Sequence, residues 1–388
     1  MKRLLPGATI GVLGGGQLGR MLLYEAHRMG YEVHILDPDP DCPSAKRADH
    51  YIEAPFADAA AAVRLAEGCD VVTLETEHIP ADVLDEVARV APLHPGADVL
   101  RNIQDRLAQR RFLAEHDLPQ PRFAAVDGPD SLREALAEVG HPAVLKSRRG
   151  GYDGKGQARI RSPEEAQQAW AEVGVPAVLE AFVPFDKEVS VLLARGVDGT
   201  IAIWPLAENV HRDGVLHTTR APAAVPIELA KEAEHIAIRT IEALGHVGVA
   251  AVEMFVADDT LLINEVAPRT HNSGHYTLGA ATTSQFEQHL RAVCGLALGD
   301  PTLTRPAAMV NLLGDLWTGG PDWEGVLRHP DARLHLYGKR HARPGRKMGH
   351  ILVMADDSGR ALERAEAMHD ILATAGTQTT GPEAKTAR

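Results

Sequence analysis

Cysteines are scarce in this sequence, and it has no long apolar run. The three cysteines, Cys42, Cys69 and Cys294, are far apart and odd in number, so they form neither a zinc-binding spacing nor a disulfide framework. This usage favours a reducing compartment, and we expect a cytoplasmic protein. The N-terminus, MKRLLPGATIGVLGGG, lacks the apolar segment and cleavage site of a signal peptide. Without a stretch of about 18 apolar residues, we expect no membrane span.

Runs of positive charge are also absent. The formal net charge is −13 and no long lysine or arginine tract occurs, which argues against a nucleic-acid partner but allows a local basic pocket. The chain has 388 residues, of which 45% are hydrophobic, enough for roughly two to four domains. We therefore expect a multidomain protein that binds small molecules.

The N-terminal part alternates between strand-like and helix-like segments. Residues 8–13 are typical of a buried strand, residues 17–30 of an amphipathic helix, and the run ending at Asp37 of a second strand. This alternation predicts a parallel α/β sheet in a first unit, residues 1–105. A second unit follows over residues 106–300.

A turn-rich stretch after Cys294 marks the next boundary, and residues 301–388 are predicted to form a small α+β unit.

The stretch EMFVADDTLLINEVAPR, residues 253–269, is the most informative of the chain. Two apolar runs flank the turn ADD, which predicts a β-hairpin with Glu253 in one strand and Glu265 in the other. A buried carboxylate is costly unless its charge is compensated, and two facing carboxylates with the neighbouring Asn264 suit Mg²⁺. The alternative is a surface hairpin with solvated acids.

The register of this hairpin decides between the two interpretations. If the loop centres on Asp259, Glu253 faces Glu265; if it centres between Asp258 and Asp259, Glu253 faces Asn264 and Glu265 points away. We predict the first register, or a bulge that restores it.

A G-x-G-x-x-G sequence at 14–19 follows the first strand, and Asp37 ends the next. This is a dinucleotide-binding fingerprint and supports a competing function, an NAD-dependent oxidoreductase. Physically, however, such a turn only aims backbone N–H groups at an anion, so any phosphate ligand can use it. Gln17 and Leu18 in the turn can meet a sugar phosphate.

A second nucleotide site is indicated further along the chain. Lys146 ends the apolar run PAVLK, and the glycine-rich GGYDGKG, residues 150–156, can fold its amides over phosphates. Alone, such a loop is equally typical of a mobile turn. Glu180 closes a strand whose continuation offers an exposed edge to an adenine, and Glu188 can accept from ribose hydroxyls. Taken alone, the two acids would be solvated.

The chain resembles the ATP-grasp superfamily in the order of four features: Lys146, the glycine loop, EAFV…E and E…NEVAPR. Within this superfamily, the chain is similar over nearly its whole length to the N5-carboxyaminoimidazole ribonucleotide synthases of purine biosynthesis. The segments that carry this similarity are GVLGGGQLGRML, TLETEH, GGYDGKGQ, APRTHNSGHY and PGRKMGH. The resemblance implies a Rossmann-like pre-ATP-grasp domain, a two-part ATP-grasp core with a lid subdomain at about 121–183, and a small C-terminal domain. It also implies a homodimer and an ATP-dependent carbon–nitrogen ligase that joins 5-aminoimidazole ribonucleotide to bicarbonate.

The resemblance also implies site residues, position by position. The ATP contacts are Arg106, Lys146, Gly151, Tyr152, Asp153, Gly154, Lys155, Gly156, Gln157, Glu180, Ala181, Phe182, Val183, Glu188, His211, Asn264 and Glu265. Mg²⁺ is assigned to Glu253 and Glu265, and the ribonucleotide to Gln17, Leu18, Glu75, Asn272, Lys339, Arg346 and Lys347. One departure is visible: Ala267 stands where many ATP-grasp enzymes have an asparagine.

The chemistry requires charge neutralisation and protection from water. Phosphorylation of bicarbonate would give carboxyphosphate, which the substrate amine attacks directly or after release of CO₂. Lys146 and Arg269 fit the neutralising role, and Tyr152 and Lys155 on the glycine loop, the expected lid, can touch the reacting groups. In the alternative interpretation, Tyr152 is a packing aromatic and Arg269 pairs with a structural acid.

The remaining polar clusters also allow two interpretations. Glu75 and Glu77 are predicted to share a strand face where a parallel strand ends, so one can hold the imidazole amine. The basic residues 339, 346 and 347 form a phosphate clamp or a solvated turn. The spacing of His271 and His275 would suit zinc on a helix, but a substrate-facing loop is favoured. A formate-using transformylase and a non-catalytic nucleotide-binding module remain as rival functions.

Overall fold

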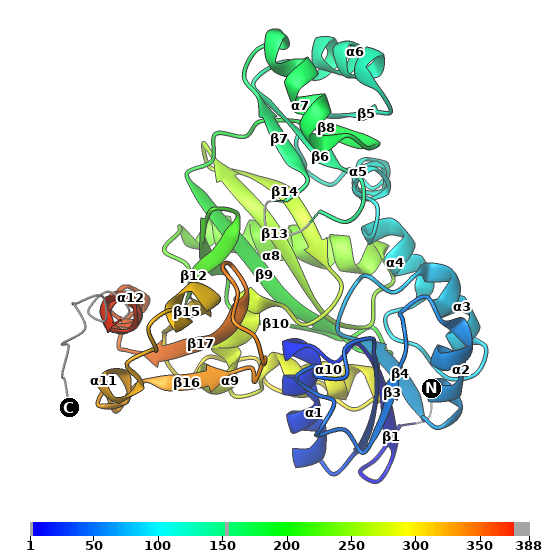
Figure 1. The fold of residues 1–388 in the computed structure, drawn as a ribbon, viewed down its shortest axis with the longest axis vertical. Coiled ribbons are helices and arrows are strands. Elements are labelled where there is room, and N and C mark those ends of the chain that lie inside the picture. The colour runs from blue at the N-terminus through cyan, green and yellow to red at the C-terminus, as the bar shows by residue number, and fades with distance from the viewer. Residues whose placement is uncertain (1–2, 152–154, 376–388) are drawn as a thin grey trace, which may run out of the picture.

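The computed structural model describes residues 3–151 and 155–375. Figure 1 shows the N-terminal unit and a small second sheet at opposite ends of the molecule, with a large central sheet between them and the C-terminal helices at its side. None of the helices in the described ranges combines the length and apolarity needed to cross a membrane.

The N-terminal unit is a four-stranded parallel sheet in the order β3-β2-β1-β4, as predicted. Its elements are β1 (Thr9–Leu13), α1 (Gln17–Arg28), β2 (Glu32–Asp37), β3 (His50–Glu53), α2 (Ala59–Glu67), β4 (Val71–Leu74), α3 (Ala81–Ala88) and α4 (Ala97–Ile103). Leu18, Leu22 and Leu23 are buried on one face of α1, as their spacing predicts. Because β4 ends at Leu74, Glu75 and Glu77 lie beyond the strand that was predicted to carry them.

The second sheet is antiparallel, with the order β5-β8-β6-β7. It comprises β5 (Phe123–Val126), α6 (Pro129–Val139), β6 (Ala143–Ser147), β7 (Gln157–Ile160), the 3₁₀ turn η1 (Pro163–Glu165), α7 (Ala166–Val173) and β8 (Ala177–Ala181). Leu132 and Ala135 of α6 and Ala169 of α7 share its core. The preceding helix α5 (Arg106–Glu115) is capped by Asp105, whose carboxylate accepts from the backbone of Leu107 and Ala108.

The central sheet has nine strands, in the order β14-β13-β9-β11-β12-β15-β17-β16, and β10 adds to β9. The strands are β9 (Lys187–Arg195), β10 (Ile201–Ile203), β11 (Ala207–Arg212), β12 (Val215–Ala221), β13 (Gly248–Ala257), β14 (Thr260–Ala267), β15 (Ala307–Leu313), β16 (Arg333–Leu336) and β17 (Lys347–Met354). The helical elements are α8 (Ile227–Ala243), η2 (Asn272–Tyr276), α9 (Thr277–Ala280), α10 (Gln285–Val293), η3 (Gly314–Trp317), α11 (Trp323–Leu327) and α12 (Ser358–Ala375).

The C-terminal strands continue the central sheet. Strand β15 pairs with β12, with Thr218 opposite Val310, and α12 packs on β15 and β17. The C-terminal segment therefore has its own helices but shares its sheet with the preceding unit. This continuity places the start of β17, with Lys347, beside the rest of the site.

Candidate active site

One cavity of about 780 Å³ opens between the second sheet, the β13–β14 hairpin and the N-terminal glycine turn. The predicted site residues that line it are Gln17, Leu18, Glu75, Arg106, Lys146, Gly151, Gln157, Glu180, Ala181, Phe182, Val183, Glu188, His211, Glu253, Asn264, Glu265, Arg269, Asn272 and Lys347. Among the described residues that were predicted, Lys155, Gly156, Lys339 and Arg346 do not line it. Tyr152, Asp153 and Gly154 lie outside the described residues.

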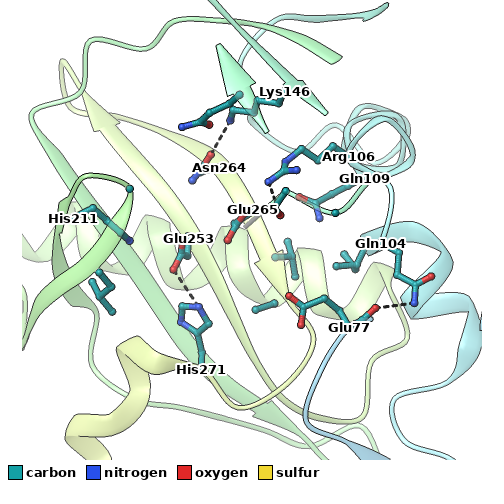
Figure 2. Close-up of a pocket in the computed structure, with 18 of the residues that line it drawn as sticks. Glu77, Gln104, Arg106, Gln109, Lys146, His211, Glu253, Asn264, Glu265 and His271 are labelled. Atoms are coloured by element: carbon teal, nitrogen blue, oxygen red, sulfur yellow. Dashed lines mark hydrogen bonds and ion pairs between the residues drawn. The ribbon is translucent and has the colours of Figure 1, made fainter. Parts of the chain in front are cut away.

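Glu253 faces Glu265 across the hairpin, as predicted, because a bulge changes the register between the two strands. The turn brings Ala257 opposite Thr260, which alone would set Glu253 against Asn264. The register shifts between Met254 and Glu253, so Glu253 pairs with Glu265. In Figure 2 both carboxylates point into the same space.

This pair of carboxylates is electrostatically unfavourable without a cation. Burial and the facing Glu265 raise the pKa of Glu253 from 4.5 to about 7. Carboxylate oxygens are the ligands that Mg²⁺ prefers, and a divalent ion between them would remove the repulsion, so the donor set fits this metal. Ala267 lines the cavity without a side-chain oxygen, while the Asn264 amide oxygen lies 3.4 Å from Lys146 Nζ.

Two ion pairs meet at Glu180, in the second sheet. Lys146 Nζ lies 2.8 Å from Glu180 Oε2, and Arg110 binds both oxygens of the same carboxylate. Burial alone would raise the pKa of Glu180, but Arg110 and Lys146 lower it to about 2. Glu180 is only 3% exposed, so the alternative of a solvated acid is wrong. The Glu188 carboxylate, in contrast, contacts His211 Nδ1.

The edge predicted for an adenine is the continuation of β8 at residues 181–183; the strand itself is not an edge strand, because it lies between β5 and β6. Its continuation is also partly used: the Ala181 N–H donates to Arg122 O at 2.9 Å and the Phe182 N–H to Pro142 O at 3.0 Å. Glu180 and Ala181 at the end of the strand line the cavity, and so do Phe182, Val183 and Phe185 beyond it. There, the stacked rings of Phe185 and Phe255, 4.6 Å apart, provide an apolar wall.

Arg106 fixes the start of the glycine loop. Its Nη1 donates to Ser147 O at 3.0 Å and its Nη2 to Gly151 O at 3.3 Å. A Cβ on Gly151 would lie 2.7 Å from Arg106 Nη1 and 2.9 Å from the backbone oxygen of Lys155, so this approach favours glycine.

The N-terminal glycine turn already holds anions that belong to the protein itself. Glu75 Oε1 and Oε2 accept from the backbone of Gly16 at 2.8 Å and Gly19 at 2.7 Å, and Asp37 accepts from Gly15 at 2.7 Å. Burial raises the pKa of Glu75, while the two N–H donors oppose the shift. A pyrophosphate would have to displace these carboxylates, so the geometry does not favour the dinucleotide interpretation.

Arg269 is bound by Glu77, through Nε to one carboxylate oxygen and through Nη2 to the other at 2.8 Å. Burial alone would raise the pKa of Glu77, but Arg269 lowers it to about 2; Glu77 in turn raises the pKa of Arg269 despite its burial. The alternative that Arg269 pairs with an acid is therefore correct, although the pair also lines the cavity.

The substrate cluster predicted at the C-terminal end is only partly brought together. Lys347 lines the cavity, whereas Arg346 Nη1 donates to His341 O at 2.7 Å and Lys339 Nζ lies over the Tyr337 ring. Asn272 lines the cavity and is 7% exposed, and within the described structure its Oδ1 and Nδ2 have no hydrogen-bond partner.

The two histidines considered for zinc diverge. His271 Nε2 lies 3.4 Å from Glu253 Oε1, while the His275 ring stacks on His350 and its Nδ1 lies 3.0 Å from Gln285 Nε2. His271 therefore belongs to the wall that carries the carboxylate pair (Figure 2), and His275 to the packing behind it.

Known protein families match all three successive parts of the chain. Three family models match in order: a ribonucleotide synthetase preATP-grasp domain at 7–104, an ATP-grasp domain at 111–286 and a phosphoribosylaminoimidazole carboxylase C-terminal domain at 307–364. The N5-carboxyaminoimidazole ribonucleotide synthase of Brucella melitensis is 46% identical over 90% of this chain and 96% of its own length. The chain belongs to the N5-carboxyaminoimidazole ribonucleotide synthase family.

Other members of this synthase family agree in sequence and in fold. The Bacillus subtilis synthase is 43% identical over 90% of this chain and 92% of its own. A crystal structure of an N5-carboxyaminoimidazole ribonucleotide synthetase with ADP has a TM-score of 0.92, is 43% identical, and covers 96% of this chain and 99% of its own. The Aspergillus clavatus synthase with ADP and 5-aminoimidazole ribonucleotide has a TM-score of 0.88 at 32% identity, covering 96% of this chain and 100% of its own.

Gln109 and Arg110 line the synthase cavity but were not predicted. They follow Arg106 at three and four positions on α5, so all three share a helix face. That spacing was a usable signal in the sequence, since it points polar side chains in the same direction as a predicted ATP contact.

Proposed function

We infer that this chain carries out the reaction of its family, the ATP-dependent carboxylation of 5-aminoimidazole ribonucleotide with bicarbonate. The products are N5-carboxyaminoimidazole ribonucleotide, ADP and phosphate. The observation that carries this inference is that one continuous cavity is lined by Lys146, by the Glu253–Glu265 pair, and by Glu75 and Lys347. A nucleotide, bicarbonate and an amine with a phosphate tail can then lie in sequence.

At the nucleotide end, we assign the adenine to Phe182, Val183 and the apolar wall of Phe185 and Phe255, and the ribose to Glu188. Lys146 would move from Glu180 to the phosphates, because both anions compete for one ammonium 2.8 Å from the carboxylate. Glu253 and Glu265 would hold Mg²⁺, which when bound neutralises phosphate charge and orients the transferred group.

In the middle of the cavity, bicarbonate attacks the terminal phosphoryl group and carboxyphosphate forms. We assign charge stabilisation there to Arg269, whose guanidinium Glu77 holds in a fixed orientation. On the family resemblance, Tyr152 and Lys155 are proposed to complete the site. Carboxyphosphate hydrolyses in water, so the enzyme must exclude solvent before the amine attacks.

At the far end, the ribonucleotide would contact Gln17, Leu18, Glu75, Asn272 and Lys347. Asn272 brings a buried amide without a partner in the described structure, which a polar ligand would satisfy. Glu75 accepts from the N–H of Gly19, but the N–H groups of Gln17 and Leu18, at the start of α1, have no acceptor within their own helix and suit a phosphate. On the resemblance, we add Lys339 and Arg346 as phosphate contacts, and propose a cytoplasmic homodimer.

The proposal is tested by ADP release from ATP and Mg²⁺, measured with and without the ribonucleotide and with bicarbonate or formate. ADP formation should require the ribonucleotide and bicarbonate, and ¹⁸O from labelled bicarbonate should appear in the released phosphate. Activity with formate alone would favour the transformylase. Tight NADH binding without ATP turnover would favour the oxidoreductase.

A further inference from the structure

Arg110 is the most completely bonded buried cation near the cavity, and it is not among the predicted contacts. Its side chain is 2% exposed. Nε and Nη2 donate to the two oxygens of Glu180 at 2.8 and 2.9 Å, and a further pair of bonds reaches the carbonyls of Ile263 and Asn264, each at 2.8 Å. Gln120 Oε1, at 3.5 Å, completes the set, so all five N–H groups have an acceptor.

The two carbonyls that Arg110 binds belong to the bulge. Consecutive carbonyls of a regular strand point to opposite edges, yet Ile263 O and Asn264 O both meet one guanidinium. Here the pairing passes from Met254–Ile263 to Glu253–Glu265 and leaves Asn264 as the extra residue. The Ile263 N–H also turns outward, to Pro119 O at 2.8 Å. The outer edge of the bulge is therefore bonded to the α5 region.

The bulge decides where Glu265 points. Without the bulge, the turn register would set Glu253 against Asn264 and move Glu265 to the other face of the hairpin. A bulge exposes carbonyls that the neighbouring strand cannot serve, and a buried carbonyl without a donor is costly. Arg110 supplies the donors, and its fork reaches both carbonyls and the Glu180 carboxylate at once.

We propose that Arg110 is a positioning residue for the metal site: it holds the bulge that brings Glu265 opposite Glu253. Through Glu180, which binds Lys146 at 2.8 Å, the same guanidinium fixes the phosphate-binding lysine relative to the carboxylate pair. Arg110 thus connects strand β8 of the second sheet to β14 of the central sheet, where the two sheets meet (Figure 1). The proposal rests on the metal role given to Glu253 and Glu265 above.

The test uses Mn²⁺ as the probe, titrated by EPR into the full-length enzyme saturated with ADP. Arg110→Lys keeps the positive charge beside Glu180 but cannot reach both carbonyls. We expect Mn²⁺ affinity to fall ten- to hundredfold, the usual range for residues that orient a metal ligand, with metal-free ADP affinity within about threefold of wild type. Arg110→Met should lose a similar amount, because geometry rather than charge is decisive.

Arg220→Lys is the matched control. Arg220 also bridges strands of the central sheet, with Nη2 2.7 Å from Glu208 Oε1, but it does not contact the hairpin carbonyls. Its Mn²⁺ affinity should stay at the wild-type value. Melting curves identify which variants are folded. If neither Arg110 variant folds, Gln120→Leu, which removes the fifth acceptor, should still weaken Mn²⁺ roughly threefold or more.

Two results would overturn the proposal: a folded Arg110→Lys variant that binds Mn²⁺ as the wild type does, or, in the fallback, a folded Gln120→Leu variant that does. A loss in Arg110→Met alone would show that only the charge matters. If the wild type with ADP binds no Mn²⁺, or binds it equally after Glu253→Gln, the assigned metal site is wrong. That outcome is separate from the Arg110 result, which requires a working site in the wild type.

Discussion

Glu253→Gln should stabilise the metal-free protein while abolishing its use of Mg²⁺. Glutamine preserves the shape and an oxygen that can accept from His271 Nε2. The wild-type carboxylate has a pKa raised to about 7, against 4.5 unfolded, because it is buried and faces Glu265. A raised acid pKa means that the folded state binds the extra proton, so this contribution to stability declines as pH rises from about 4.5 to 7.

The magnitude follows from the pKa difference. At pH 8 the wild type holds an ionised Glu253 at a cost of about 3 kcal/mol, and at pH 5 the cost is below about 1 kcal/mol. The variant should therefore melt roughly 3–6 °C above wild type at pH 8 in EDTA, a gain that largely disappears at pH 5. With ADP already present, adding Mg²⁺ should raise the melting temperature of the wild type but not that of the variant.

Glu208, in the same sheet, provides a control for which the expected change in stability has the opposite sign. Burial alone would raise the pKa of Glu208, but Arg220 and Lys187, at 2.7 and 3.0 Å, lower it. Glu208→Gln should therefore destabilise the protein at pH 8. If Glu253→Gln is also less stable at pH 8 without metal, or if its gain is the same at both pH values, Glu253 does not carry the strained charge that the hairpin geometry implies.

Three further predictions concern the cavity walls. Glu77→Gln should lower the melting temperature at pH 7, and the loss should shrink between pH 4.5 and 2, where the wild-type carboxylate, whose pKa Arg269 lowers to about 2, becomes protonated. Lys347→Ala should reduce kcat/KM for 5-aminoimidazole ribonucleotide roughly ten- to hundredfold with little change in ATP affinity, and an equal loss for both would assign it a structural role. Gly16→Ala places a Cβ 2.5 Å from Glu75 Oε1, so the KM for the ribonucleotide should rise; an unchanged KM would argue against Glu75 as a contact.

The sequence was sufficient where local chemistry decides the structure. The parallel N-terminal sheet, helix α1 and the β13–β14 hairpin follow from periodicity and turn residues, and their bounds agree closely with expectation. The facing of Glu253 and Glu265 also followed, but only as a choice between two registers. The turn itself prefers the wrong one, and the correction depends on Arg110, which lies more than 150 positions earlier in the chain.

Features that depend on sheet order could not be read in the same way. Strand β8 is an apolar run with an acid near its end, and it lies between β5 and β6. The Glu180 carboxylate then meets Arg110 and Lys146 instead of solvent. Nothing local to residues 177–181 specifies either neighbour. Strands β15–β17 likewise join the central sheet through the pairing of β15 with β12, and nothing in the sequence of β12 indicates that partner.

The N-terminal turn shows why a motif alone does not name its ligand. Its glycines present backbone N–H groups as a dinucleotide fingerprint requires, but Glu75, which follows β4 at its carboxyl end, binds the amides of Gly16 and Gly19. The carboxylate occupies the position where a pyrophosphate would be held. A bound ligand must therefore approach from the cavity side, past Gln17 and Leu18 and against Glu75 itself. An acid at this position repels a diphosphate, so one distant residue changes which ligand the amides of Gly16 and Gly19 can accept.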